Sequence, residues 1–192
     1  MEFCKSTGLV VTYEDDDLLK IIAIKRALTI AQIYHLELVK EEISIGKLIR
    51  IIELLPDLHT LSIDSLSIHQ SKPFSAKELR KFSRTKNTTR IGKVCLLQMN
   101  SVNDIDFLMA LFPAMTNFKI VQMKNMSIEF YLCHILKKIN TDGHRSLRSL
   151  SFYHPTADDQ LVKTLENMIV NENLLDNYSI KRVLSVICLQ WK

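Results

Sequence analysis

The stretch Leu54-Leu-Pro-Asp-Leu-His-Thr-Leu-Ser-Ile63 joins a helical apolar pattern to an alternating one. Pro56 cannot continue a helix, so it ends the one predicted by the apolar residues before it. After the proline, Leu61 and Ile63 lie two residues apart, which places both on one face of a strand. Leu58 turns the chain into that strand. The stretch therefore predicts a helix, a turn and a strand in succession. The helical residues are Leu48, Ile51, Ile52 and Leu55.

The same spacing of three apolar residues returns along the chain. Successive copies begin 25, 33, 24 and 32 residues apart, and helix-like sequence separates most of them. Self-similarity at such intervals indicates a stacked array in which each strand and helix bury a core only against their neighbours. The five triplets are Ile33/Leu36/Leu38, Leu58/Leu61/Ile63, Ile91/Val94/Leu96, Met115/Phe118/Ile120 and Leu147/Leu150/Phe152.

The register of the array depends on two prolines. Because 47% of the residues are apolar, a loose template also matches by chance. Pro56 and Pro113 precede their triplets at the same offset, and each follows a helical apolar pattern, so they mark the same point of two units. A competing register takes Val94/Leu97/Met99 with Phe118/Val121/Met123. We prefer the register anchored on the prolines.

Helices and strands alternate along the rest of the sequence. A helical pattern covers 18–31 and an extended one 34–39. Further helices are expected to begin at Ser44, Asn103 and Ser127, and at the capping-box sequence that starts at Thr156. The alternating stretches 178–180 and 187–191 predict a hairpin that covers the end of the sheet. We divide the single domain, 1–192, into an N-terminal helical cap (1–32), the repeats with a basic insertion (72–90), and a C-terminal cap (174–192).

The composition bears on membrane association and on the location of the protein in the cell. No run of 18 apolar residues is present, and the first residues do not resemble a secretory signal. The four cysteines have no CxxC spacing, which is typical of reduced thiols. We therefore expect no membrane association and a cytoplasmic or nuclear location.

Three stretches resemble the leucine-rich repeats of the F-box protein family. They are Lys47 to Ile63, Lys93 to Leu96 with Phe107 to Pro113, and Asp158 to Ile169 leading into 177–191. The resemblance covers 31–192 and implies an α/β solenoid with parallel strands on one face, helices on the other and a C-terminal hairpin cap. Position nine of the repeats departs from the asparagine of the common pattern. It holds Glu41, Leu66, Met99, Met123 and Pro155, so the turns must satisfy their backbone groups in another way.

The resemblance also implies a function. In that family an F-box docks on the adaptor of a cullin ubiquitin ligase, and the repeats recruit a protein substrate. No F-box is found in this sequence, so contact with the adaptor would require one upstream. We expect a protein-interaction module and favour the substrate-recruiting part of such a ligase component. A scaffold without a ligase connection is a further reading.

Strand alternation defines a predicted protein-binding surface. The residues that flank the apolar pairs should share the face opposite the helices, where Tyr153 is an aromatic anchor of the kind found at interfaces. An ordinary solvated sheet face is the alternative. The predicted protein-binding residues are His35, Glu37, Thr60, Ser62, Asp64, Lys93, Cys95, Asn117, Lys119, Ser149, Ser151 and Tyr153.

The segment 72–93 carries eight basic residues and one acid, a net charge of +7 within a chain of +4. Lys77, Arg80, Lys81 and Arg84 should share one helical face, opposite Leu79 and Phe82. This face predicts binding to nucleic acid or another polyanion as the alternative function, although nucleic acid is not the partner we favour. A solvated helix is the simpler explanation.

Catalytic motifs are not recognised. The six histidines make no HExxH, and no GxSxG or P-loop is present, so we predict no enzyme, metal or cofactor. Lys93 beside Cys95 suggests a lowered thiol pKa. His35 and Glu37 could form a surface ion pair.

Overall fold

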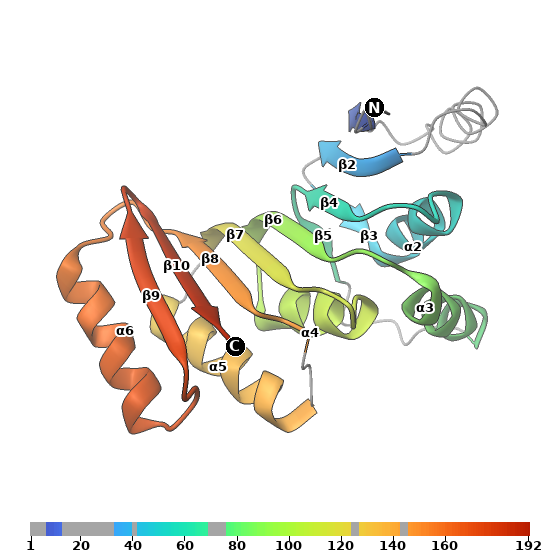
Figure 1. Ribbon diagram of the computed structural model, residues 1–192. Helices are drawn as coiled ribbons and strands as arrows, with labels where there is room; N and C mark the ends of the chain where they lie inside the picture. The colour runs from blue at the N-terminus through green and yellow to red at the C-terminus, as the bar shows by residue number, and fades with distance from the viewer. Residues whose placement is uncertain (1–6, 13–32, 40–41, 69–75, 124–126, 143–145) are drawn as a thin grey trace, which may run out of the picture.

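The computed structural model describes residues 7–12, 33–39, 42–68, 76–123, 127–142 and 146–192. Their main feature is one mixed sheet in the order β1-β2-β4-β6-β7-β8-β10-β9. Neighbouring strands from β1 to β8 run parallel, whereas β10 pairs antiparallel with both β8 and β9 (Figure 1). The strands are β1 (Thr7–Thr12), β2 (Ile33–Val39), β4 (Thr60–Ile63), β6 (Lys93–Met99), β7 (Asn117–Met123), β8 (Ser149–Tyr153), β9 (Tyr178–Val183) and β10 (Val186–Trp191).

The five apolar triplets stand in register across this sheet. The second residues form one continuous row of paired positions, Leu36, Leu61, Val94, Phe118 and Leu150. The third residues form the next row, Leu38, Ile63, Leu96, Ile120 and Phe152. All fifteen side chains of the triplets are at most 4% exposed. The register anchored on the prolines is therefore the one the fold adopts.

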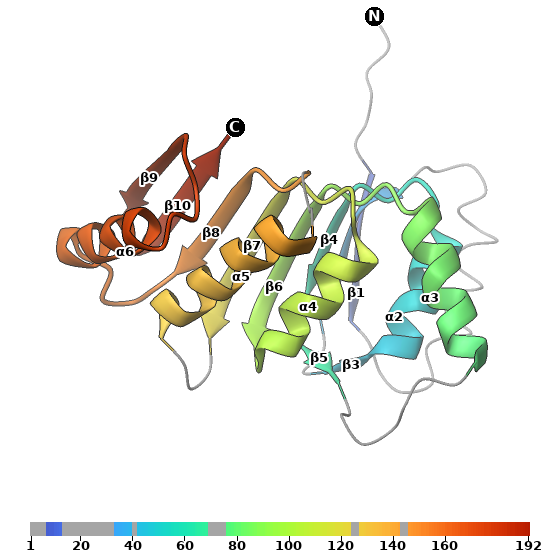
Figure 2. The ribbon, with the colours of Figure 1, turned by 90° about the horizontal axis from the view of Figure 1, so that it is seen from below.

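The described helices lie side by side on one face of the sheet (Figure 2). Their buried residues meet the rows of the triplets and complete one apolar core. A short pair of parallel strands, β3 (Ile43–Ser44) and β5 (Leu66–Ser67), lies apart from the large sheet. The helices are α2 (Ile45–Leu54), α3 (Ala76–Thr88), α4 (Val102–Leu111), α5 (Ile128–Asp142) and α6 (Asp159–Asn171).

Main-chain hydrogen bonds join one unit to the next just before the strands. The carbonyl oxygen of His59 accepts from the N–H groups of Gly92 and Lys93, at 3.0 and 3.1 Å. The carbonyl of Gly92 in turn accepts from Thr116 and Asn117, at 2.8 and 3.0 Å. The carbonyl of Thr116 repeats this pattern with Arg148 and Ser149, at 2.9 and 3.1 Å. No asparagine side chain is needed for these links.

The turn after β6 satisfies its backbone through an acid. The Asp104 carboxylate accepts from the N–H groups of Asn100 (2.8 Å) and Ser101 (3.1 Å), and its side chain is 1% exposed. Ser101 is the N-cap of α4. The prediction that Asn103 begins this helix was wrong by two residues, because Asp104 fixes the turn before it.

Two of the other predicted helix starts are close to the observed ones. Ser127 accepts the N–H of Phe130 at 3.2 Å and begins α5 as expected, and α2 follows Ser44. The start expected at Thr156 was wrong. Asp158 is the N-cap of α6, and its carboxylate accepts the Leu161 N–H at 2.7 Å.

The N-terminal part contains a strand where only a helical cap was expected. Residues 7–12 form β1, which extends the parallel sheet by pairing with β2. The helix predicted over 18–31 lies outside the described residues. At the other end, the predicted hairpin is confirmed, since β9 and β10 pair antiparallel and β10 pairs with β8.

The helix α3 occupies the position that the sequence assigned to a basic insertion. It contacts α2 on one side and α4 on the other, and leads into β6 as α4 leads into β7. Phe82 packs on Phe107 of α4 with ring centroids 5.8 Å apart, and Thr85 is 1% exposed. The described part of this segment thus takes the place of the helix of its own unit.

Candidate functional site: the open face of the sheet

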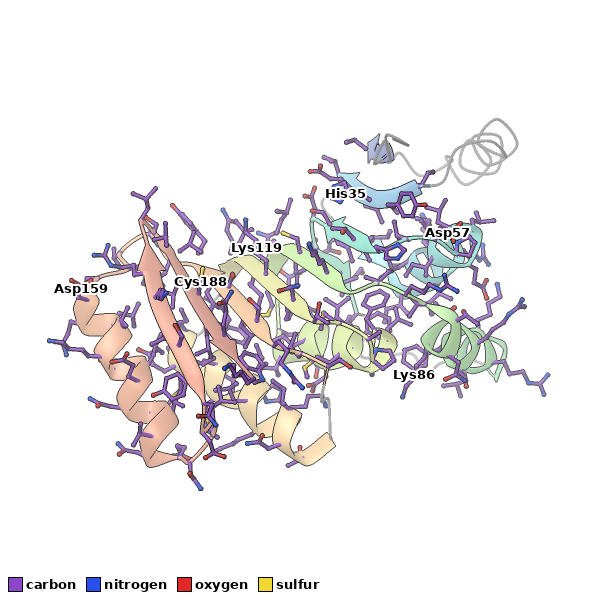
Figure 3. The ribbon with its side chains drawn as sticks, in the orientation of Figure 1. His35, Asp57, Lys86, Lys119, Asp159 and Cys188 are labelled. Carbon is purple, nitrogen blue, oxygen red and sulfur yellow. The ribbon has the colours of Figure 1, made fainter. Side chains whose placement is uncertain are left out.

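The face of the sheet opposite the described helices, which we call the open face, carries two polar rows. The central row crosses all eight strands as paired positions: Val10, Glu37, Ser62, Cys95, Lys119, Ser151, Cys188 and Lys181. The second row lies toward the amino ends of the parallel strands: Gly8, His35, Thr60, Lys93, Asn117, Ser149, Gln190 and Ser179. Figure 3 labels His35, Lys119 and Cys188, which follow one another along the sheet.

The structure gathers the predicted protein-binding residues on this one surface. Ten of the twelve lie in the two rows, Tyr153 ends β8 on the same face, and Asp64 follows β4. Their placement follows from strand alternation, because their neighbours in each strand are the buried members of the triplets. Their role in binding remains a prediction.

The hairpin adds residues to the open face that the sequence analysis treated only as a cap. Lys181, Cys188 and Gln190 extend the two rows over β9 and β10. The alternation of β10, in which Ile187 and Leu189 are buried and their neighbours are not, carried this signal. It was missed because the end of the sheet was considered separately from its face.

Charge is divided unevenly along the open face. Glu37 on β2 and Asp64 after β4 are its acids. On β6, β7, β8, β10 and β9 the open-face positions include Lys93, Lys119 and Lys181 and no acid. All three lysine side chains are exposed, and none forms an ion pair with any residue that the structure describes. We call this part of the surface the basic half.

Apolar side chains border the basic half at the carboxyl ends of the parallel strands. Tyr153 pairs with Val186, which pairs with Val183. Tyr153 is 39%, Val183 61% and Leu184 85% exposed. Leu97 and Val121 continue the border on β6 and β7 and are half-buried. These residues form what we call the apolar patch: Leu97, Val121, Tyr153, Val183, Leu184 and Val186.

The turn of the hairpin places a leucine in a costly conformation. Leu184 has φ of 55°, in the left-handed region that side chains other than glycine rarely adopt. Its side chain is also the most exposed large apolar side chain of the described residues. Neither backbone preference nor burial explains a leucine at this position.

Cys95 lies near the middle of the central row. Burial raises the pKa of its thiol, while the Lys119 ammonium and a hydrogen bond with Ser62 lower it and Glu37 raises it. The expected lowering of the Cys95 pKa by Lys93 was therefore wrong, because the cation that acts on the thiol is Lys119 and burial outweighs it. A thiol with a raised pKa is a poor nucleophile at neutral pH.

The basic surface of α3 differs in part from its prediction. Arg80 and Arg84 are exposed one turn apart, and Lys81 is half-buried beside Phe82. Leu79 was expected on the buried face but is 52% exposed, because the helix turns Phe82 and Thr85 toward the core instead. Lys77 lies within α3, but its side chain is outside the described residues.

The described helices hold a histidine–carboxylate pair, in which His134 Nε2 of α5 lies 2.9 Å from Asp106 Oδ1 of α4. Within the described residues, no group of three or more His, Cys, Asp or Glu side chains is placed to hold a metal ion. His35 and Glu37 share a face but no hydrogen bond or ion pair joins them. Two hollows of about 400 and 420 Å³ lie beside Trp191, and Asp176 supplies their single carboxyl side chain.

Comparisons with known proteins give no relative for this chain. A scan of protein-family models and searches of curated proteins and solved structures find no significant match. No helix of the described ranges has both the length and the apolar character needed to cross a bilayer.

Proposed function

We propose that this chain is a leucine-rich-repeat-like interaction module that binds a protein partner through the open face. The supporting observation is the pair of polar rows that crosses all eight strands without a covering helix from the described residues. The side chains on the opposite face are accounted for by the core, because the triplets there are buried against the helices. The open face contributes little to the core, so its exposed lysines and tyrosine are available to a partner.

We extend the proposal to ubiquitin ligation on the basis of the resemblance to F-box proteins. In this reading the module recruits a substrate in the cytoplasm or nucleus, and an F-box supplied upstream connects it to the cullin adaptor. A scaffold that binds its partner without a ligase is the competing reading. The two share the open face and differ only in the adaptor.

A photocrosslinking amino acid tests the open face directly. We would place it at Tyr153 on the open face and, in a matched control, at Val170 on α6, which is 64% exposed. Irradiation in cells that express the native gene should give discrete protein adducts from position 153 alone. Adducts from position 170 alone, or the same adducts from both, would contradict the proposal.

The ligase reading has its own test. The protein expressed from its complete native gene should copurify with the cullin-ligase adaptor, and the adaptor should be lost when residues upstream of the repeats are removed. Adducts from position 153 without any adaptor in the purified complex would favour the scaffold.

The exposed cations of α3 support a second function, binding to a polyanion. Arg80, Arg84 and Lys86 are exposed, and Arg90 lies between α3 and β6. Such a site should bind labelled single-stranded nucleic acid with an affinity that falls steeply with salt. Replacement of Arg80 and Arg84 by glutamine should abolish that binding if α3 is the site, and leave it unchanged if it is not.

A further inference from the structure

The basic half and the apolar patch are neighbouring parts of one surface. Lys119 lies in the central row of β7, and Tyr153 lies two positions beyond Ser151, its row neighbour on β8. Two residues along a strand correspond to about 6.6 Å. A ligand on the central row is thus within side-chain reach of the patch.

We propose that the basic half binds an extended, acidic and apolar segment of the partner protein, which crosses β7, β8, β10 and β9. Its carboxylates contact Lys119 and Lys181, and its apolar side chains cover the apolar patch. This inference rests on the proposed function and specifies the chemistry of the partner. Charge complementarity is its basis, because three exposed lysines stand on this half without an acid beside them.

The spacing of the two lysines sets the spacing of the carboxylates. Lys119 and Lys181 stand in the same row and are separated by the strands β8 and β10. Three steps between strands amount to about 14 Å at roughly 4.8 Å each. An extended chain advances about 3.3 Å per residue, so acids at positions i and i+4 match the lysines. Ser151 and Cys188 between them offer small polar groups that leave room for a backbone.

Electrostatics also limit where the segment can lie. Glu37 occupies the central row on β2, and Asp64 follows β4. An acidic segment placed over β2 and β4 would meet these like charges, which oppose binding. The segment is therefore confined to the strands from β6 onward.

The exposed Leu184 supports a ligand at this end of the sheet. Its left-handed backbone is unfavourable for residues other than glycine, and its side chain is 85% exposed, so burial in the free protein does not offset this cost. Strain of this kind is concentrated at functional sites. An apolar side chain of the bound segment would cover Leu184 together with Val183.

The test is a selection from a random displayed peptide library on the whole chain, followed by anisotropy with the synthetic fluorescein-labelled peptides that are selected. We expect enrichment of Asp or Glu pairs four residues apart with aliphatic or aromatic residues around them. Lys119→Glu and Lys181→Glu should each weaken binding about tenfold or more. Lys163→Glu on the exposed surface of α6 is the matched control and should leave the affinity unchanged.

The outcomes separate this inference from the proposed function. Thermal unfolding checks that each variant folds, and Lys119→Gln replaces Lys119→Glu if the latter does not. Selected peptides that bind at the open face but carry no acidic residues would overturn the inference and leave the proposed function standing. A selection without binders, or binders insensitive to both lysines, would also overturn it. The crosslinks from position 153 then judge the proposed function by themselves.

Discussion

Leu55 and Phe112 adopt nearly the same backbone conformation at equivalent points of two units. Their φ and ψ angles are −125° and 71° at Leu55 and −117° and 71° at Phe112. Each ends its helix and precedes a proline, which excludes the helical conformation for the residue before it. The carbonyl of Leu55 then accepts the Leu58 N–H at 3.1 Å, and the carbonyl of Phe112 accepts the Met115 N–H at 3.0 Å.

This equivalence predicts equal effects of replacing the two prolines. Pro56→Ala and Pro113→Ala should each lower the free energy of unfolding by about 0.4–1 kcal/mol, because alanine gives the unfolded chain more freedom. Urea denaturation of the two variants measures the loss. A loss at one site several times larger than at the other would show that the two turns are not equivalent.

The succession of parallel strands and helices and the register of the triplets could be predicted from the sequence because they depend on local signals. Proline fixes where a helix ends, and a spacing of two fixes which residues share a strand face. Both signals survive in a single sequence, and they correctly placed Leu61 beside Val94 and Phe118 beside Leu150. The twelve predicted surface residues follow from the same alternation.

Other features could not be read from local patterns. Thr7–Thr12 has no apolar triplet, and only its pairing with β2 identifies it as a strand. The caps of α4 and α6 were placed two residues away because several capping residues stand together, as at Ser101 and Asn103. The direction in which α3 faces depends on the space beside Phe107, which periodicity does not encode.

A substitution in the buried rows should be severe. Leu96 is fully buried in the middle strand of the third-residue row. Leu96→Ala should lower the free energy of unfolding by about 2–5 kcal/mol, because it removes apolar contact and leaves a cavity. Leu79→Ala makes the same chemical change at a side chain that is 52% exposed, and should stay within about 0.5 kcal/mol. Similar losses at both sites in denaturant titrations would contradict the assigned core.

Replacing the strained leucine should stabilise the protein while weakening its binding. Leu184→Gly removes the cost of a left-handed leucine and should raise the free energy of unfolding by up to about 1 kcal/mol. Leu184→Ala keeps the backbone strain, and should leave the stability close to that of the natural chain. Differential scanning calorimetry compares the three proteins. Destabilisation by glycine would mean that the leucine side chain contributes contacts in the free protein.

Asp104 should give a specific pH dependence of stability. Its burial raises the pKa of the carboxyl group, although the N–H groups of Asn100 and Ser101 partly offset this. The folded protein therefore holds this proton more tightly than the unfolded chain. Stability should fall as the pH rises from the ordinary carboxyl pKa through the raised one.

The variant Asp104→Asn isolates this effect, because its amide oxygen can still accept both N–H groups and does not titrate. The natural chain should lose stability relative to the variant as the pH rises through that window, and the difference should be constant above it. Urea unfolding from pH 3.5 to 8 provides the comparison. A difference that does not change with pH, or that changes in favour of the natural chain, would contradict the raised pKa.

The thiol of Cys95 should react slowly. In a chain whose other cysteines, Cys4, Cys133 and Cys188, are replaced by serine, alkylation by iodoacetamide should reach half its maximal rate at a higher pH than in the urea-unfolded chain. Lys119→Met should raise that pH further, since the ammonium lowers the pKa. Glu37→Gln should lower it. A midpoint below that of the unfolded chain would mean that the thiolate is stabilised on the open face.

The links through the carbonyl groups of His59, Gly92 and Thr116 are made by main-chain atoms, and the Thr116 hydroxyl adds a hydrogen bond to the Gly92 carbonyl at 3.0 Å. Every amino acid brings the same peptide oxygen, so the accepting half of each link does not depend on the residue type. Many substitutions at these turns would therefore keep the main-chain links between neighbouring units. Distant homologues should therefore be sought by the spacing of the repeated units, because the residue types at these turns can vary.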